Sequence, residues 1–249
     1  MTSGGPSLER RHRDPHARWR LYCFPPAAAP ASMFNAWGRA FPGQVEVCGV
    51  ELPGHGRRLH EAPIAELRGL VEATCETLLP ELDRAFAIFG HSMGALVGYE
   101  VARHLGSRYQ RQPAYLFVSG HRAPQLPIAR PPLHRLDDRT FIEQLTARDG
   151  APLGLGGEGE LLQLILPVLR TEAELCETYE HVPGPLLACH ISALGGVDDP
   201  TVTAGELRAW QAQTTGRFRL HTFPGGHAFI RTAGAEVAAA LGQDLQLVG

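Results

Sequence analysis

Apolar residues gather in short runs that alternate with longer amphipathic stretches. The short runs have the length and the two-residue periodicity of β-strands, and they predict strands at about residues 18–24, 45–51, 86–90, 114–119, 187–194 and 217–223. The longer stretches repeat apolar residues at helical spacing and predict helices at about residues 32–41, 65–84, 94–107, 203–213 and 229–246. This alternation predicts an α/β fold: a mainly parallel sheet of about six or seven strands with helices on both faces.

The stretch from 121 to 185 interrupts this alternation, because it is far longer than one crossover helix requires. It opens with several prolines and then carries helical patterns at about 138–147 and 160–169, with another after 171. Long connections of this kind in compact domains are often lids. The pattern at 160–169 is apolar nearly all round, which fits a lid helix over an acyl-binding channel or, alternatively, a helix buried in an ordinary core.

The most informative motif lies directly after the third expected strand. There Gly90-His91-Ser92-Met93-Gly94 separates an apolar strand from the start of a helix. In hydrolases built on an α/β sheet, such a Gly-x-Ser-x-Gly turn holds a serine hydroxyl above the strand ends. The alternative is a glycine-punctuated turn whose serine is only hydrogen-bonded. The strand-turn-helix context favours Ser92 as a nucleophile.

A serine nucleophile needs a base and a carboxylate that orients the base. His227 follows the strand expected at 217–223, and the strand expected at 187–194 runs into a turn with Asp198 and Asp199. A Gly-x-x-Asp-x-x-Val spacing favours Asp199 as the acid and leaves Asp198 to cap the turn or face solvent. For His227, the alternative is a loop histidine without a catalytic role. Ser92, Asp199 and His227 should project from one edge of the sheet, because each follows a parallel strand.

Composition narrows the class of protein. The net charge of −3 over 249 residues lacks the basic field typical of nucleic-acid binders, and the sequence has no apolar run of membrane-spanning length. The five cysteines are scattered without a Cys-x-x-Cys pair, which predicts buried thiols in a reducing cytoplasm rather than disulfides or a metal site. We therefore expect no metal, no cofactor, no nucleic acid and no membrane partner.

Two segments carry weaker signals. Residues 1–18 hold arginine, glycine and proline without the apolar stretch of a secretion signal, and they predict a flexible tail before a single domain at 19–249. A targeting segment is the alternative, against which its acidic residues argue. Residues 154–159 satisfy Gly-x-Gly-x-x-Gly but follow no strand, so we expect a hinge or a plain loop rather than a dinucleotide site.

Taken together, these motifs resemble type II thioesterases of polyketide and nonribosomal peptide biosynthesis, which have the α/β-hydrolase fold. The resemblance spans about residues 21–241, and three lid segments separate this family from generic esterases. The matching segments are Cys23-Phe24-Pro25, Ala31-Ser32-Met33-Phe34, Leu52-Pro53-Gly54-His55-Gly56-Arg57-Arg58, Gly90-His91-Ser92-Met93-Gly94-Ala95, the lid segments Glu160-Leu161-Leu162, Leu166-Pro167-Val168-Leu169-Arg170 and Glu177-Thr178-Tyr179, and then Asp199-Pro200 with Val202, Trp210 and Gly225-Gly226-His227.

The resemblance implies hydrolysis of acyl thioesters from the phosphopantetheine arm of an acyl or peptidyl carrier protein, which clears stalled or misprimed synthases. Ser92 would attack the thioester, His227 would take its proton and Asp199 would hold the imidazole. The backbone N–H groups of Ala27 and Met93 would form the oxyanion hole. A carrier would dock on a local basic patch, for which the candidates, otherwise ordinary solvated side chains, are Arg57, Arg58, Arg122, Arg130 and Arg135.

The chain departs from the family pattern at two places. Pro26-Ala27-Ala28-Ala29 stands where His-Ala-Gly-Gly is usual, and Ala228 stands where an aromatic residue is usual. Alanine disfavours positive φ, so the first departure bears on the geometry of the oxyanion loop. Two other functions stay open: another esterase or acyltransferase of this fold, or a non-catalytic module that binds carrier proteins. We expect a cytoplasmic protein and a monomer, while the acyl group and the synthase served are not specified by the sequence.

Overall fold

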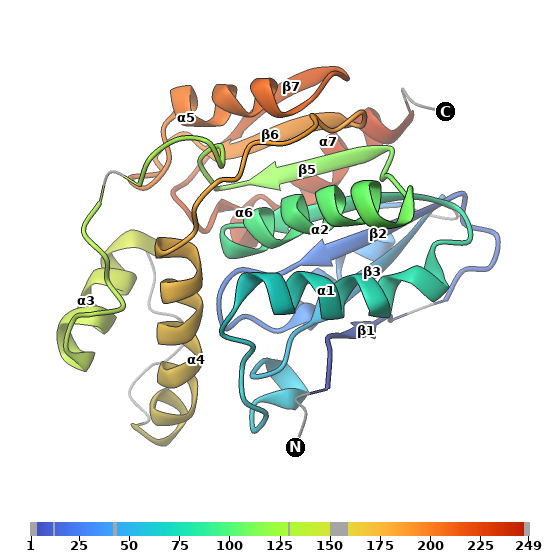
Figure 1. Cartoon of the computed structure of the whole chain (residues 1–249). Coiled ribbons are helices and arrows are strands. Elements are labelled where there is room, and N and C mark those ends of the chain that lie inside the picture. The colour runs from blue at the N-terminus through green and yellow to red at the C-terminus, as the bar shows by residue number, and fades with distance from the viewer. Residues whose placement is uncertain (1–3, 12, 42–43, 129, 150–158, 247–249) are drawn as a thin grey trace.

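The computed structural model describes residues 4–11, 13–41, 44–128, 130–149 and 159–246. Within them a seven-stranded sheet has the order β1-β3-β2-β4-β5-β6-β7 (Figure 1). The pairing of β1 with β3 is antiparallel and every other neighbouring pair is parallel, so the expected mainly parallel sheet is confirmed. The strands are β1 (Ser7–Glu9), β2 (Trp19–Phe24), β3 (Val45–Glu51), β4 (Ala85–His91), β5 (Tyr115–Ser119), β6 (His190–Gly196) and β7 (Phe218–Phe223).

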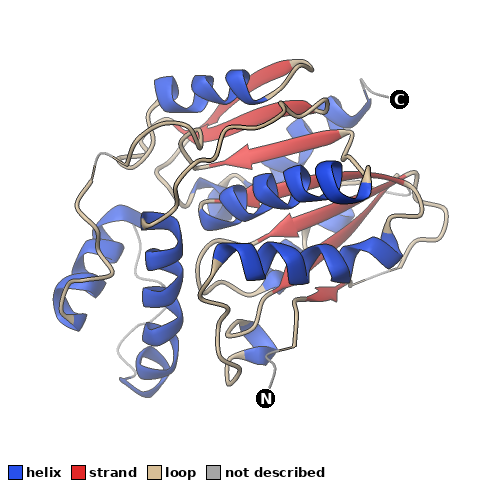
Figure 2. Ribbon diagram, in the orientation of Figure 1, coloured by secondary structure: helices blue, strands red, loops and turns tan. Residues whose placement is uncertain are grey.

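Helices cover both faces of this sheet (Figure 2). The helices α1, α2 and α5 with η5 pack on one face, and η1, η2, α6 and α7 pack on the other. Outside the lid, the helical elements are η1 (Ala31–Phe34), η2 (Trp37–Arg39), η3 (Gly56–Arg58), α1 (Leu67–Leu78), η4 (Leu79–Glu81), α2 (Met93–Tyr109), α5 (Ala204–Arg208), η5 (Ala209–Gln213), α6 (Phe229–Thr232) and α7 (Gly234–Gln246).

The side-chain alternation of the central strands divides the core into two layers. In β2, Tyr22 and Phe24 join the layer under α1 and α2, whereas Leu21 and Cys23 join the layer under α6 and α7. All four side chains are fully buried. Because successive side chains of a strand point to opposite faces, a strand with helices on both faces is mainly apolar on both sides. This explains why β4 and β5 read as nearly continuous apolar runs.

Several expected boundaries are wrong, and the differences have local causes. The helix expected at 32–41 is two short 3₁₀ turns, and the helix expected at 229–246 is broken at Ala233. The strand expected from 187 begins at His190, because Leu187 makes only an isolated bridge to Thr214. Apolar periodicity marks burial, and it does not distinguish a continuous helix from short turns packed on the same face.

The flexible tail expected before residue 19 is wrong for the segment around β1. Leu8 pairs with Val50 along the edge strand β3, and Arg10 forms ion pairs with Glu81 (2.8 Å) and Glu46 (3.4 Å). An edge strand offers unpaired backbone groups, and here β1 covers them. The sequence signal was weak because three residues are too few to show a strand period.

The long insertion forms a pair of helices, α3 (Asp138–Asp149) and α4 (Gly159–Glu177), beside the carboxyl ends of the strands (Figure 1, left). The two helical patterns expected from 160 onward are one helix that contains Pro167. Two residues of the lid signatures hold it in place: Arg170 donates to the Leu136 carbonyl (2.8 Å), and Tyr179 donates to Glu100 of α2 (2.7 Å). The glycine motif at 154–159 falls almost entirely outside the described residues.

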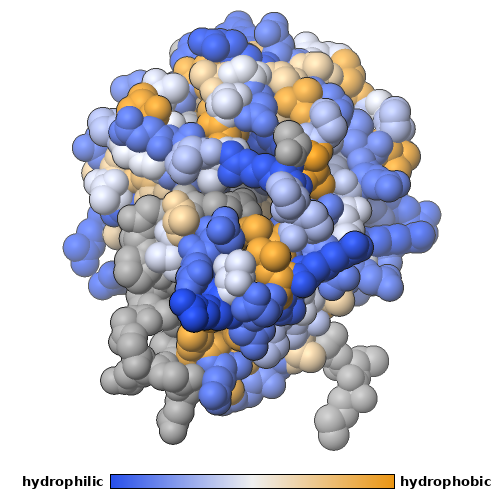
Figure 3. Space-filling view, turned by 90° about the vertical axis from the view of Figure 1, so that its left-hand side faces the viewer, coloured by the Kyte–Doolittle hydropathy of each residue, from blue (hydrophilic) through white to orange (hydrophobic). Residues whose placement is uncertain are grey.

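The apolar side chains of α4 are only partly buried. Val168 and Leu169 are buried, whereas the Leu164 side chain is 46% exposed. Figure 3 views the molecule from this end, where hydrophilic atoms predominate and hydrophobic atoms form small separate patches. Among the described residues, α4 is therefore a surface helix with one buried side, and the alternative of an ordinary core helix is wrong.

Asp244 ties α7 to the last two strands. Its carboxylate is fully buried, accepts a hydrogen bond from Ser192 (2.6 Å) and contacts Arg219 (2.8 Å) and His221 (2.8 Å). Burial raises the pKa of Asp244, but these partners lower it by more, so that it lies below the ordinary value. The ionised carboxylate therefore stabilises the fold above the unfolded-state pKa of about 3.9, and this contribution is lost as pH falls through the folded pKa.

We predict that Asp244→Asn lowers the free energy of unfolding by about 2 kcal/mol at neutral pH, because charged hydrogen bonds in a buried site are lost. Urea denaturation at pH 7 and at successively lower pH measures this, and the difference from wild type should shrink below about pH 4. Glu236→Gln, an exposed change on the same helix, serves as the control and should have little effect. A pH-independent difference would contradict the role assigned to the charge.

Candidate active site

Ser92 occupies a strained turn between β4 and α2. Its backbone has φ 53° and ψ −120°, outside the regions that residues with a side chain normally adopt. The two flanking glycines make the turn possible, since a Cβ at Gly90 would overlap the Gly94 carbonyl and a Cβ at Gly94 would overlap the Phe24 carbonyl. The helix thus begins directly against two strands, and Ser92 stands at their carboxyl edge.

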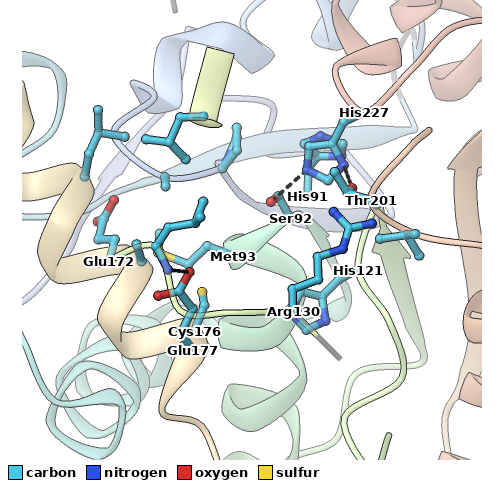
Figure 4. A pocket seen from close by; sticks show the side chains of 18 of the residues that line it. His91, Ser92, Met93, His121, Arg130, Glu172, Cys176, Glu177, Thr201 and His227 are labelled. Atoms are coloured by element: carbon cyan, nitrogen blue, oxygen red, sulfur yellow. Dashed lines mark hydrogen bonds between the residues drawn. The ribbon is translucent and has the colours of Figure 1, made fainter. Parts of the chain in front are cut away.

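Ser92, His227 and Asp199 form a continuous hydrogen-bonded chain. The Ser92 hydroxyl lies 3.0 Å from His227 Nε2 (Figure 4), and His227 Nδ1 lies 2.9 Å from Asp199 Oδ2. An ionised carboxylate can only accept, so Nδ1 carries the proton of a neutral imidazole and Nε2 is free to accept from the serine. The structure thus brings together the three residues that the sequence placed at one sheet edge.

The structure places Asp199, and not Asp198, beside the histidine. Asp199 Oδ1 accepts the backbone N–H (2.7 Å) and the hydroxyl (2.6 Å) of Thr201, while its other oxygen contacts His227. Burial raises the pKa of Asp199, but the hydrogen bonds from His227 and Thr201 lower it by more, so that the carboxylate is ionised at neutral pH. Asp198 is exposed, and its backbone N–H donates to the Gly225 carbonyl (3.0 Å).

A cavity of about 570 Å³ opens beside Ser92 and is lined in part by residues of α3 and α4. Ala27 and Met93, the residues expected to supply oxyanion N–H groups, both line it, as does Ala228. Met93 is the first residue of α2, whose initial N–H groups have no partner inside the helix. The walls are mainly apolar and include Met33, Ile128, Leu136, Leu145, Leu169 and Ile230.

Comparison with known proteins agrees with this geometry. The family model described as "Thioesterase domain" matches residues 19–245. The chain belongs to the thioesterase family. It is 37% identical to the gramicidin S biosynthesis protein GrsT of Aneurinibacillus migulanus over 93% of this chain and 91% of that protein.

Two solved structures extend the comparison to three dimensions. The RedJ thioesterase from the prodiginine biosynthetic pathway in Streptomyces coelicolor superimposes with a TM-score of 0.86 at 37% identity, covering 93% of this chain and 87% of that one. The type II thioesterase BorB from the borrelidin biosynthetic cluster gives a TM-score of 0.87 at 32% identity, covering 95% and 96%. These likenesses confirm the expected α/β-hydrolase fold of the thioesterase.

Sequence reasoning missed two residues that support the histidine. The hydroxyl of Thr201 lies 2.8 Å from His227 Nδ1 as well as bonding to Asp199. His91 is buried, its ring centre lies 5.2 Å from that of His227, and its Nδ1 lies 2.9 Å from the Ser119 hydroxyl. Burial and the neighbouring His227 hold the pKa of His91 well below its usual range, so this ring is neutral and adds no competing charge. A threonine two residues after an aspartate is a turn signal, and this signal could have pointed to Thr201.

The described residues contain no cluster of three or more His, Cys, Asp or Glu side chains suited to a metal ion. The five cysteines are free, and four of them are buried. Burial raises the pKa of Cys48 to about 11 and that of Cys75 to about 12, so both are neutral thiols near pH 7. No helix in the described part of the chain has the length and apolarity to cross a membrane.

We predict that Asp199→Asn lowers kcat for thioester hydrolysis by roughly 10³- to 10⁴-fold, because the imidazole loses both its tautomer control and the charge that stabilises its protonated form. Asp198→Asn, an exposed change one residue away, should cost less than about threefold. Steady-state hydrolysis of one thioester by both variants makes the comparison. A larger loss in Asp198→Asn would overturn the assignment of the acid.

Proposed function

We propose that this thioesterase is a type II, editing enzyme that hydrolyses acyl groups from the phosphopantetheine arm of acyl or peptidyl carrier proteins. The observation that carries the proposal is the Ser92–His227–Asp199 chain, which opens into a cavity of about 570 Å³ beneath a helical lid. The likeness to the type II thioesterase BorB and to the gramicidin S biosynthesis protein GrsT supports the same function. Its free cysteines suit an enzyme of the reducing cytoplasm.

The reaction would proceed through an acyl-enzyme. His227 Nε2 accepts the proton of Ser92 as the serine oxygen bonds to the thioester carbonyl carbon, and Asp199 stabilises the imidazolium that forms. The N–H groups of Ala27 and Met93 hold the oxyanion, after which the carbon–sulfur bond breaks and the pantetheine thiol leaves with the proton from His227. Water, deprotonated by the same nitrogen, then attacks the ester and releases the acid and free Ser92.

The size of the cavity fits a broad choice of small to medium acyl groups. Its wall combines apolar side chains with the polar groups of Thr140 and Gln144. Such a chamber takes up the acyl chain mainly by burying apolar surface, and this discriminates only modestly between neighbouring homologues. Broad acceptance is what an enzyme needs if it removes varied incorrect acyl groups from a synthase.

We predict that Ser92→Ala lowers hydrolysis of an acyl carrier-protein thioester by a factor on the order of 10⁴ or more and abolishes covalent labelling by a fluorophosphonate. An unchanged Tm would show that the variant is folded. If hydrolysis persisted above about a tenth of the wild-type rate, Ser92 would not be the nucleophile. Transfer of the acyl group to an alcohol or amine instead of water would favour the acyltransferase alternative, and absence of turnover in wild type would favour a binding module.

The part of α4 that we expect to select chain length lies mostly after the apolar pattern at 160–169. Among the described residues, the cavity wall from α4 begins at Leu169 and continues through Ala173 and Cys176. The helix turns its later residues toward Ser92, and Leu164 points largely to solvent.

We predict that Ala173→Leu, which adds bulk to the cavity wall, changes the ratio of kcat/KM between acetyl and octanoyl thioesters about tenfold in favour of acetyl. Leu164→Trp on the same helix is the matched control and should leave the ratio unchanged. Competition between the two thioesters in one reaction measures the ratio directly. Equal ratios in the Ala173 variant and wild type would place the acyl chain elsewhere.

Two of the five arginines suggested for carrier docking, Arg58 and Arg122, are only partly exposed. Arg58 donates to the Gly5 carbonyl (2.8 Å), which connects it to the N-terminal segment, and it forms an ion pair with Glu61 (2.5 Å). Arg122 is half-buried and donates to backbone carbonyls, including that of Leu126. The other three arginines, Arg57, Arg130 and Arg135, are exposed. Arg130 also lines the cavity and donates to the Pro200 carbonyl.

We predict that kcat/KM for an acyl carrier-protein substrate falls about tenfold as salt rises from low to high ionic strength, because an acidic carrier is steered by these cations. The same acyl group on a small neutral thiol should respond little. The double change Arg130→Glu and Arg135→Glu should remove most of the salt response, whereas Arg68→Glu on α1 should not. If kcat/KM depended on salt equally for the two substrates, the enzyme would not be binding the surface of the carrier protein.

A further inference from the structure

The loop that carries Ala27 is held by a buried side chain from the lid. Glu172 of α4 is only 4% exposed, and its Oε2 accepts the backbone N–H of Ala28 (2.8 Å). Its other oxygen contacts His55 Nε2 (2.5 Å). Figure 4 shows Glu172 on α4, on the other side of the pocket from His227. The sequence analysis gave Glu172 no function.

Ala28 needs such support because its backbone is strained. Its φ is 52°, in the left-handed region that residues with a Cβ disfavour. The N–H that Glu172 binds belongs to the peptide joining Ala27 to Ala28, so this hydrogen bond fixes the orientation of that peptide. Without it, the loop would be free to relax toward an ordinary conformation and to carry the N–H of Ala27 with it.

His55 fixes the neighbouring peptide and balances the charge of Glu172. Its ring is fully buried, and Nδ1 lies 2.8 Å from the Ala29 carbonyl. A carbonyl and a carboxylate both accept, so both ring nitrogens donate and His55 is an imidazolium paired with ionised Glu172. Burial lowers the pKa of His55, but Glu172, the Ala29 carbonyl and nearby Glu51 raise it by more, in agreement with this assignment.

A second buried acid completes the support from the body of the enzyme. Glu51, the last residue of β3, is 1% exposed and accepts the backbone N–H of Ala31 (3.1 Å). Glu51 and His55 belong to the catalytic body, whereas Glu172 belongs to the lid. The Ala28 N–H, next to the expected oxyanion donor Ala27, is thus the group through which the lid helix holds this loop.

We propose that Glu172 is a positioning residue that couples the seating of lid helix α4 to the assembly of the oxyanion hole at Ala27. The inference rests on the proposed function, since it takes Ala27 as an oxyanion donor. When α4 is seated, Glu172 binds the Ala28 N–H and the loop is set for attack. When α4 moves away, Ser92, His227 and Asp199 remain joined, but one of the two oxyanion donors is misplaced. The active site therefore reaches full activity only with the lid in place.

The test uses Glu172→Ala, Glu172→Gln and Ala28→Gly, alone and combined, with an acyl thioester of a small thiol and a p-nitrophenyl ester. Glu172→Ala should lower kcat about 10- to 100-fold, because a misplaced oxyanion donor weakens the transition state, while KM changes less than about threefold. Glu172→Gln keeps an acceptor for Ala28 but loses the charge pair with His55, so its kcat should lie between. Glu174→Gln, an exposed change two residues along α4, should match wild type.

The deciding measurement is rescue by glycine. Ala28→Gly removes the strain that Glu172 restrains, so in the Glu172→Ala background it should restore kcat at least about fivefold. It should also restore the affinity for a trifluoromethyl ketone, which forms an oxyanion on Ser92. If the Tm of Glu172→Ala shows that this variant is unfolded, the same comparison is made between Glu172→Gln and the double variant Glu172→Gln with Ala28→Gly. An unchanged kcat, or no rescue by glycine, would overturn the proposal. Activity on both small esters without activity on any carrier thioester would overturn the proposed function and leave this test valid.

Discussion

The close contact of three backbone segments at Gly90 and Gly94 is the constraint on which the active site depends. The helix α2 can begin against β4 and the end of β2 only because neither glycine carries a Cβ. That contact holds Ser92 in its strained conformation and starts α2 at the carboxyl ends of β4 and β2, so that the first backbone N–H groups of the helix lie beside the serine. The strain is held by the packed core on both faces of β4, whose side chains are nearly all buried.

Two buried carboxylates join segments that are distant in sequence. Asp199 contacts His227 at the site, and Asp244 connects the C-terminal helix to β6 and β7. Burying a carboxylate is costly unless hydrogen bonds replace the water it has lost. The hydrogen bond that Asp199 needs for this reason also orients the His227 imidazole.

The helix α4 contributes side chains to the cavity beside Ser92. Leu169 and Ala173 of α4 line the cavity, and Glu172 between them contacts the loop at residues 26–29. Alanine at positions 27–29 gives a loop less able to hold a left-handed residue by itself than glycine would be. The buried pair of Glu172 and His55 contacts the backbone of this loop at Ala28 and Ala29.

The sequence by itself determined the α/β sheet, the turn at Ser92 and the positions of His227 and Asp199, because strand period, glycine spacing and chain order are local or sequential properties. It also predicted a helical insertion between β5 and β6. Only the tertiary structure decided which side of α4 faces the cavity, that residues 7–9 complete the sheet, and that Thr201, His91, His55 and Glu172 surround the site. Glu172 and Ala28 are 144 residues apart. A contact of that kind leaves no period or spacing in the chain, since it exists only after the two segments have packed together.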